Sequence, residues 1–291
     1  MKKKKMLLTG VNGFLCSRVA KYFEEKYHVI PLTRKELDIT NHKEAERIIK
    51  ENNPNIIFHA AAMSATLPCE NNPELAHKVN LDAALNIARV AKETKAKMLF
   101  LSSEQVFNGN TNEGPYGEDD KAVPSTVYGE TKLKAEGLLR KELKELWILR
   151  LSWMFGLPEK NVPNNPNLLW KSLKAVLTNQ PIKISTNEYR GITYVYDLIE
   201  NLEKIFDLPY GTYHFGSVNE ESTYDTTVYI LNKIGISKEI IDRVICRDDE
   251  KHRDQKRDLR MDYNKIISKG INIRTSQESI DRAIKEFDFK L

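Results

Sequence analysis

Short apolar runs alternate with longer amphipathic segments from residue 6 to about residue 155. The short runs have the length and composition of buried β-strands and lie at 6–8, 28–32, 56–60, 98–102 and 147–151. The longer segments repeat apolar residues at helical spacing, at 17–26, 43–52, 73–95 and 128–143. This alternation predicts an α/β fold in which a doubly wound parallel sheet carries helices on both faces. In such sheets, ligands bind beyond the carboxyl ends of the strands.

The pattern changes after residue 155. Residues 156–167 are rich in Pro, Asn and Gly, which interrupt regular structure. Beyond them the chain predicts helices at 168–178, 196–208, 224–234 and 276–287, and strands at 182–184 and 212–215. We therefore expect two joined parts. The larger domain lies at 1–155, and 156–291 forms mainly a smaller C-terminal α/β substrate-binding lobe. Residues at about 192–216 are expected to return to the first domain.

Composition narrows the classes of protein to consider. The 291 residues carry 45 Lys and Arg against 41 Asp and Glu, a net charge of +4, with the two signs interspersed. This balance gives no argument for a nucleic-acid partner. No run of the sequence reaches the roughly 18 apolar residues of a membrane span, and the three cysteines form no CxxC pair. We expect a soluble protein of the reducing cytoplasm, without a membrane contact or a bound metal.

The amino terminus shares some features with a lipoprotein signal, because the basic stretch Met1–Lys5 precedes a short apolar run that ends in Cys16. However, Thr9 and Gly10 interrupt the run, and the bulky Leu15 stands where a cleavage site needs a small residue. We therefore expect an unprocessed amino terminus.

The first predicted strand runs into Thr9-Gly-Val-Asn-Gly-Phe-Leu-Cys16, and a predicted helix follows. Glycines at 10 and 13 allow a sharp turn whose amides approach a phosphate at the positive end of that helix. An ordinary turn with two glycines is the alternative, but the strand before it and the helix after it favour a Rossmann-like dinucleotide site. Cys16 stands where a third glycine is expected, so the helix should pack slightly further from the strand.

The second strand is followed by Thr33, Arg34 and Lys35 instead of the acidic residue that binds the ribose 2′-hydroxyl of NAD. A guanidinium suits a 2′-phosphate, so NADP(H) is favoured, with NAD(H) as the alternative. A solvated loop arginine is the other interpretation of Arg34. Asp38 either accepts from the adenine amino group or caps the helix that starts near Asn41.

Candidate chemistry lies at the fourth strand and the helix after it. Tyr128 and Lys132 are four residues apart and therefore share one helix face. The same spacing recurs at Tyr22/Lys26 and Tyr229/Lys233, so it carries little information alone. Tyr128 and Lys132 differ from those pairs because their helix follows a strand that ends in Ser102-Ser103, where such a sheet presents its catalytic groups.

With these residues in place, the chain resembles the extended short-chain dehydrogenase/reductase family, and within it the dTDP-4-dehydrorhamnose reductase-like branch. The resemblance covers nearly the whole length. Its pieces, in order, are Thr9-Gly-Val-Asn-Gly13, Leu37-Asp-Ile-Thr-Asn41, His59-Ala-Ala-Ala62, Val79-Asn80, Ser102-Ser-Glu-Gln-Val-Phe-Asn-Gly109, Pro115-Tyr116, Tyr128-Gly-Glu-Thr-Lys132, Leu149-Arg-Leu-Ser-Trp153 and Tyr213-His-Phe215.

The resemblance implies a catalytic triad of Ser103, Tyr128 and Lys132, with Asn80 in support. It implies a nicotinamide cofactor held by Gly10, Asn12, Gly13, Phe14, Leu15, Arg34, Asp38, Ile39, Ala60, Ala61, Ala62, Asn80, Ser102, Tyr128 and Lys132. It implies a nucleotide-sugar substrate held by Ser64, Ser103, Glu104, Gln105 and Trp153. A buried core position is the alternative for Trp153, and satisfying the strand end is the alternative for Ser103.

Residue chemistry gives these groups their roles. Reduction of a ketone needs a hydride on carbon and a proton on the developing alkoxide, and a phenol supplies that proton if a nearby cation lowers its pKa from about 10. Lys132 is expected to be that cation, while Ser103 bonds the same oxygen. Related dehydratases use an Asp-Glu pair at the positions of Glu104 and Gln105, and an amide cannot serve as the base. Reduction of a nucleotide-linked 4-keto-6-deoxy sugar is therefore favoured.

Two other functions stay open. A sugar-nucleotide epimerase needs no net hydride donor and usually retains NAD, whereas Arg34 favours an exchangeable NADPH. A non-catalytic NADP-binding regulatory subunit, as in methionine adenosyltransferase, resembles the same branch. Met63 and Gln105 depart from the tyrosines of the reductase pattern, and residues 187–193 match its substrate-side segment only loosely, so the deoxysugar need not be rhamnose. The resemblance also implies a homodimer.

Overall fold

The computed structural model describes residues 3–165 and 167–287, so Met1, Lys2, Pro166 and residues 288–291 of the segments named above lie outside it. A six-stranded parallel sheet forms its centre, in the order β10-β5-β4-β3-β1-β2. The strands are β1 (Lys5–Thr9), β2 (His28–Leu32), β3 (Ile56–His59), β4 (Lys97–Ser103), β5 (Leu146–Leu151) and β10 (Gly211–Phe215). This confirms the predicted doubly wound parallel sheet.

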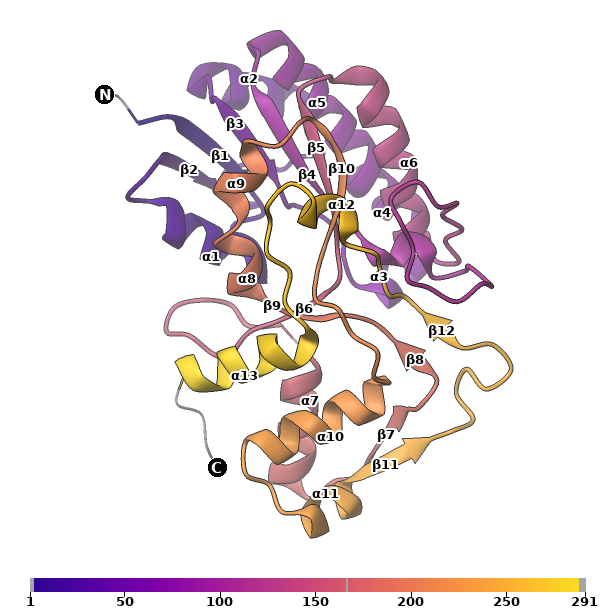
Figure 1. Ribbon diagram of the computed structural model, residues 1–291. Coiled ribbons are helices and arrows are strands. Elements are labelled where there is room, and N and C mark those ends of the chain that lie inside the picture. The colour runs from indigo at the N-terminus through magenta and orange to yellow at the C-terminus, as the bar shows by residue number, and fades with distance from the viewer. Residues whose placement is uncertain (1–2, 166, 288–291) are drawn as a thin grey trace.

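Helices cover both faces of the sheet, as Figure 1 shows. Successive strand residues point to opposite faces, so Leu7 belongs to one apolar core and its neighbours Met6 and Leu8 to another. The Leu7 core is closed by α2 (His42–Asn52), α5 (Ala83–Thr94) and α6 (Val127–Glu142), and the other by α1 (Phe14–Phe23), α8 (Val195–Ile199) and α9 (Leu202–Phe206).

The remaining elements lie mostly beyond the carboxyl ends of the central strands (Figure 1). Three pairs of short parallel strands, β6 with β9, β7 with β11 and β8 with β12, belong to this part. Their bounds are β6 (Trp153–Phe155), β7 (Ile182–Ser185), β8 (Glu188–Tyr189), β9 (Ile192–Tyr194), β11 (Ile245–Asp248) and β12 (Arg257–Asp258). The helices after β6, apart from α8 and α9, are α7 (Leu168–Thr178), α10 (Thr223–Lys233), α11 (Lys238–Val244), α12 (Asn264–Ile267) and α13 (Ser276–Glu286).

The helix predicted at 73–95 is confirmed as one helical run from Pro73 to Thr94, which follows the short helix α3 (Thr66–Asn71). The run consists of α4 (Pro73–His77), a π-helical turn η1 (Lys78–Asp82) and α5, and Asn80 in the π-helical turn is buried. The helix predicted at 196–208, in contrast, forms two short helices, α8 and α9.

Candidate active site

A cavity of about 910 Å³ runs along the carboxyl ends of the central strands. The sheet order reverses between β1 and β3, which is the switch point where such sheets bind ligands. Residues predicted for the site that line this cavity are Gly10, Asn12, Gly13, Phe14, Leu15, Arg34, Asp38, Ile39, Ala60, Ala61, Ala62, Ser64, Ser102, Ser103, Glu104, Gln105, Tyr128, Lys132 and Trp153. The structure therefore brings every predicted site residue except Asn80 to the wall of one cavity.

The glycine turn forms a narrow cradle at the start of α1. Gly10 has φ +77°, and a Cβ there would lie 2.8 Å from the Cα of Ala61. Gly13 is the N-cap of α1 and supplies no side-chain cap, so the first amides of the helix are free to donate to an anion. These features fit the pyrophosphate of a dinucleotide.

Cys16 occupies the place of the third glycine. Its side chain is buried, and its thiol donates to the Thr9 carbonyl oxygen over 3.4 Å. Burial raises the pKa of this thiol well above its usual range. Cys16 is therefore a packing residue that joins α1 to β1.

The segment after β2 contributes one basic and one acidic residue to the cavity wall, Arg34 and Asp38. The Asp38 carboxylate accepts from the Thr40 amide and hydroxyl, over 3.0 and 2.8 Å, and these bonds lower its pKa. The helix cap is Asn41, whose side chain accepts from the Glu44 amide. The capping interpretation of Asp38 is therefore wrong.

Ser103 and Tyr128 lie together at the middle of the cavity. Ser103 ends β4, and its hydroxyl oxygen accepts from the Gln105 amide over 3.2 Å. Tyr128 is in the first turn of α6 and is 9% exposed. Burial raises the pKa of the Tyr128 phenol to about 12, although the nearby Ser103 hydroxyl opposes the rise. The phenol therefore carries its proton at neutral pH.

Lys132 is fully enclosed one turn further along α6. Its ammonium donates to the Leu101 carbonyl oxygen over 2.8 Å and lies 4.5 Å from the centre of the Phe100 ring. Burial lowers the pKa of Lys132 to about 8. The expectation that Lys132 lowers the pKa of the Tyr128 phenol is not met in this structure. Burial of the phenol raises its pKa by more than the Ser103 hydroxyl lowers it.

Asn80 departs from its predicted place, because it does not line the cavity. Its side-chain oxygen accepts from the Met63 amide over 2.8 Å, and its amide donates to the Met63 carbonyl and the Thr131 hydroxyl. These bonds fix the cavity wall at Met63 to the first turns of α6. Its side chain thus supports the cavity wall from behind, and a contact between Asn80 and the cofactor stays a prediction.

A buried ionic group lies behind the proposed triad, and it was not predicted from the sequence. Glu136, one turn beyond Lys132, accepts from the Ser102 hydroxyl over 2.6 Å and from two nitrogens of Arg150 over 2.9 and 2.7 Å. The group ties α6 to the ends of β4 and β5. The four-residue repeat Tyr128, Lys132, Glu136 on one helix face is the signal that could have indicated it.

Two arginines at the other end of the cavity were also missed. Arg190 and Arg257 line it beside Glu104, Gln105 and Trp153. The Arg257 guanidinium donates to the Gln105 side-chain oxygen over 3.1 Å. Both arginines come from the C-terminal half of the chain, where the irregular segments gave little periodicity from which to place them.

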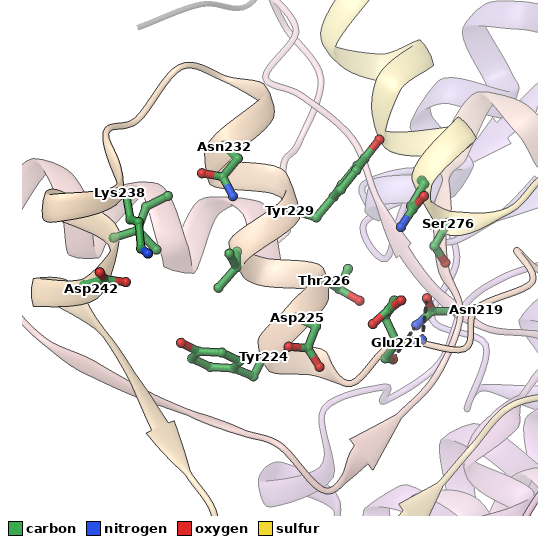
Figure 2. Close-up of a pocket in the computed structure, with 13 residues that line it drawn as sticks. Asn219, Glu221, Tyr224, Asp225, Thr226, Tyr229, Asn232, Lys238, Asp242 and Ser276 are labelled. Atoms are coloured by element: carbon green, nitrogen blue, oxygen red, sulfur yellow. Dashed lines mark hydrogen bonds between the residues drawn. The ribbon is translucent and has the colours of Figure 1, made fainter.

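Figure 2 shows a second cavity, of about 450 Å³, away from the sheet. α10 supplies Tyr224, Asp225 and Tyr229, and α11 supplies Lys238 and Asp242. None of the predicted site residues lines it. Within residues 3–165 and 167–287, no cluster of three His, Cys, Asp or Glu side chains could hold a metal ion, and no helix has the length and apolarity to cross a membrane.

The chain is similar to known proteins over most of its length. A dTDP-4-dehydrorhamnose reductase of Aggregatibacter actinomycetemcomitans is 30% identical over 249 residues, 82% of this chain and 82% of that protein. The methionine adenosyltransferase 2 subunit beta of Pongo abelii is 24% identical over 286 residues, 94% of this chain and 84% of that protein. The structure of dTDP-4-dehydrorhamnose reductase from Bacillus anthracis in complex with NADP has a TM-score of 0.85 at 24% identity, covering 98% of this chain and 99% of that chain.

The family model for the RmlD substrate binding domain matches residues 4–289. That match takes in the glycine turn, the Ser103, Tyr128 and Lys132 group and both arginines of the cavity. With the reductase relative from Aggregatibacter, it confirms the resemblance inferred from the sequence. The chain belongs to the RmlD substrate-binding-domain family.

Proposed function

We propose that this chain is an NADPH-dependent reductase of a nucleotide-linked 4-keto-6-deoxy sugar, with dTDP-4-dehydrorhamnose as the first substrate to test. The observation that carries the proposal is the meeting of a phosphate-binding glycine turn with Ser103, Tyr128 and Lys132 in one cavity. The Aggregatibacter relative is named for this activity.

The residues divide the reaction between them. A bound nicotinamide supplies the hydride to the ketone carbon. The Tyr128 phenol, which holds its proton at neutral pH, donates that proton to the developing alkoxide. The Ser103 hydroxyl donates to the same oxygen, and the Lys132 ammonium supplies positive charge beside the anionic product of proton loss.

Arg34 supports NADP(H) as the cofactor. It lies on the cavity wall after β2, where a guanidinium can pair with a 2′-phosphate. The Bacillus anthracis reductase is described in complex with NADP. NAD(H) is the weaker candidate, since a carboxylate for the ribose 2′-hydroxyl would have to come from Asp38, which is engaged by Thr40.

The organisation of the chain completes the proposal. We assign the cofactor to residues 1–155 and most of the substrate to residues 156–291, with β10 returning to pair with β5. The described cysteines are free thiols, which supports the cytoplasm as the compartment. We propose a homodimer by analogy with the family.

A regulatory role is the second candidate. The similarity to methionine adenosyltransferase 2 subunit beta, over 94% of this chain, favours it. The complete Ser103, Tyr128 and Lys132 set, which lines one cavity, favours the reductase, because a subunit without catalysis has no need of these three side chains together.

The test is NADPH oxidation, followed at 340 nm (the absorbance band of reduced nicotinamide), with dTDP-4-dehydrorhamnose. We expect steady turnover by the purified chain. Tyr128→Phe should lower it by about 10²- to 10⁴-fold, because the proton donor is lost, while NADPH binding changes little. Absence of turnover with any nucleotide keto-sugar would refute the reductase, and loss of NADPH binding in Tyr128→Phe would refute the role of Tyr128.

A further inference from the structure

Glu104 and Arg190 form a buried ion pair in the wall of the cavity. Glu104 follows Ser103 directly and is 2% exposed, and Arg190 is 8% exposed. An Arg190 Nη2 hydrogen bonds to the Glu104 Oε1, and its Nη1 donates to the Glu188 Oε1 over 3.3 Å. The guanidinium lies 4.8 Å from the centre of the Trp153 ring. Glu104, Glu188 and Trp153 therefore hold the Arg190 guanidinium in one orientation.

Each member of the pair has one polar atom left without a partner. The Glu104 Oε2 and the Arg190 Nε are buried and have no hydrogen-bond partner among the residues that the structure describes. Buried polar atoms are rarely left in this state, because the loss of water is not compensated. Both residues line the cavity, so a bound molecule can supply the missing partners.

The two atoms together select the chemistry of that molecule. Glu104 Oε2 requires a donor when ionised, and Arg190 Nε requires an acceptor. A phosphate or a carboxylate would be repelled by the Glu104 carboxylate as well as attracted by Arg190, and it would raise further the pKa of Glu104, which burial already raises to about 7. A hydroxyl group donates and accepts at once and carries no charge, so it satisfies both atoms without repulsion.

The neighbours of Glu104 show which hydroxyl is in reach. Glu104 is adjacent in sequence to Ser103 and lies close enough to Tyr128 that its charge acts on the pKa of the phenol. In the proposed function, Ser103 and Tyr128 hold the oxygen on C4 of the sugar. Of the two ring carbons beside C4 in a 4-keto-6-deoxy sugar, C3 carries a hydroxyl and C5 carries a methyl group.

We propose that Glu104 and Arg190 recognise the C3 hydroxyl of the sugar and so determine which keto-sugar the site accepts. This inference rests on the proposed function for the placing of C4. Glu104 Oε2 accepts a hydrogen bond from the C3 hydroxyl, and Arg190 Nε donates one to the oxygen of the same hydroxyl. The Trp153 ring packs against the Arg190 guanidinium and holds it in position. A sugar without oxygen at C3 leaves both atoms unsatisfied and binds more weakly.

Calorimetric binding in the presence of NADPH tests the inference, because NADPH cannot reduce an alcohol and no turnover occurs. The probes are dTDP-rhamnose, its 3-deoxy analogue and dTDP. We expect the wild-type protein to bind dTDP-rhamnose about 10- to 100-fold more tightly than the 3-deoxy analogue. In Glu104→Gln and Arg190→Lys this ratio should fall to within about threefold, with the affinity for dTDP unchanged.

Glu188→Gln is the matched control. Glu188 accepts from Arg190 through Oε1, and glutamine keeps an acceptor oxygen there, so the orientation of the guanidinium is retained. Glu188 does not line the cavity, and its Oε2 is not among the unpartnered buried atoms of the described residues. It should keep the wild-type ratio. Equal binding of the two sugars by wild-type protein, no binding of dTDP-rhamnose, or a parallel loss of dTDP affinity in Glu104→Gln would each overturn the inference. Failure of the proposed function has a different signature. The wild-type protein would then still prefer dTDP-rhamnose to its 3-deoxy analogue but would not oxidise NADPH with any nucleotide keto-sugar.

Discussion

Arg34 is the residue through which we expect the cofactor's 2′-phosphate to be recognised. It lies on the cavity wall, and a charge-assisted pair with a phosphate is a strong interaction. Arg34→Asp should raise the KM for NADPH by about 10- to 100-fold, because an attraction is replaced by a repulsion. It should lower the KM for NADH, since a carboxylate can accept from the ribose 2′-hydroxyl.

Lys35→Asp is the matched control for Arg34→Asp. Lys35 is the next residue, is exposed and does not line the cavity. The net charge of the chain changes equally in both variants, so a long-range electrostatic effect would appear in both. Steady-state kinetics with each cofactor separate the cases: an equal rise in the KM for NADPH in the two variants would contradict a direct contact by Arg34.

At the scale of residues, the sequence could predict positions that follow a strand or share a helix face. The strand end at Ser102-Ser103 and the helix face of Tyr128 and Lys132 were read in this way, the family resemblance joined Ser103, Tyr128 and Lys132 into a triad, and these three residues line one cavity. Asn80 was predicted to contact the cofactor, but its side chain bonds to Met63 and Thr131 and lies behind the cavity wall. Such bonds depend on a π-helical turn that no local pattern indicated.

Arg190 shows a different limit of sequence reasoning. Its contact with Glu104 joins residues 86 positions apart in sequence. The orientation of its guanidinium depends on Trp153 and Glu188 together. Unsatisfied atoms such as Arg190 Nε can be found only when every possible partner has been placed in space.

Helix α6 connects the proposed catalytic residues Tyr128 and Lys132 to the buried carboxylate of Glu136, and this sets an expected pH dependence. Burial lowers the pKa of Lys132 to about 8, and the Glu136 carboxylate opposes the decrease. Below this pKa Lys132 is charged, and above it the cation is lost. We therefore expect kcat/KM for reduction to be constant at lower pH and to decrease as the pH rises through about 8.

Glu136→Gln tests this arrangement, because it removes the charge that favours the protonated form of Lys132. The decrease in kcat/KM should move to lower pH, and a pH profile at saturating NADPH measures it. The control on the same helix is Glu130→Gln, which alters an exposed carboxylate that pairs with Lys134 and should leave the profile unchanged. Thermal unfolding must accompany the comparison, since Glu136 also pairs with the buried Arg150. An unshifted profile in folded Glu136→Gln would exclude the proposed effect on Lys132.

Elements were predictable where one periodic pattern had enough length. The strand at His28–Leu32 and the helix at Leu168–Thr178 have the bounds that the sequence indicated. The first helix begins at Phe14, three residues before its predicted start, because the glycine turn ends at Gly13. Strands of two or three residues, such as β8 and β12, show no periodicity, and their pairing is set by the elements around them.

The whole molecule brings distant parts of the chain to one cavity. The ends of β1 and β4 supply one side, and Arg190 and Arg257 come from the C-terminal half. The parallel sheet and its ligand edge follow from the alternation of strands and helices, which is why they could be predicted. The parallel pairing of β7 with β11 brings together segments about sixty residues apart, and no local signal in either segment specifies its partner.

Because the cavity joins these parts, NADPH should stabilise the protein as a whole. A ligand that binds only the folded state at 100 times its Kd adds about 2.7 kcal/mol. For a chain of this size, that corresponds to a rise in Tm of about 4–5 °C. Differential scanning fluorimetry with and without NADPH measures the rise. A matched pair of glycine substitutions then locates the binding site.

Gly10→Ala should lower the Tm and remove most of the rise. The positive φ of Gly10 disfavours a side chain, and the added Cβ would lie 2.8 Å from the Ala61 Cα. The backbone would have to shift to relieve this contact, and the shift would disturb the turn that we expect to bind the phosphates. Gly137→Ala is the same change inside α6, with no atom within 4 Å of the added Cβ. It should raise stability by about 0.5–1 kcal/mol through better helix propensity and keep the full NADPH effect. If Gly10→Ala kept the full effect as well, the cofactor would have to bind elsewhere than at the glycine turn.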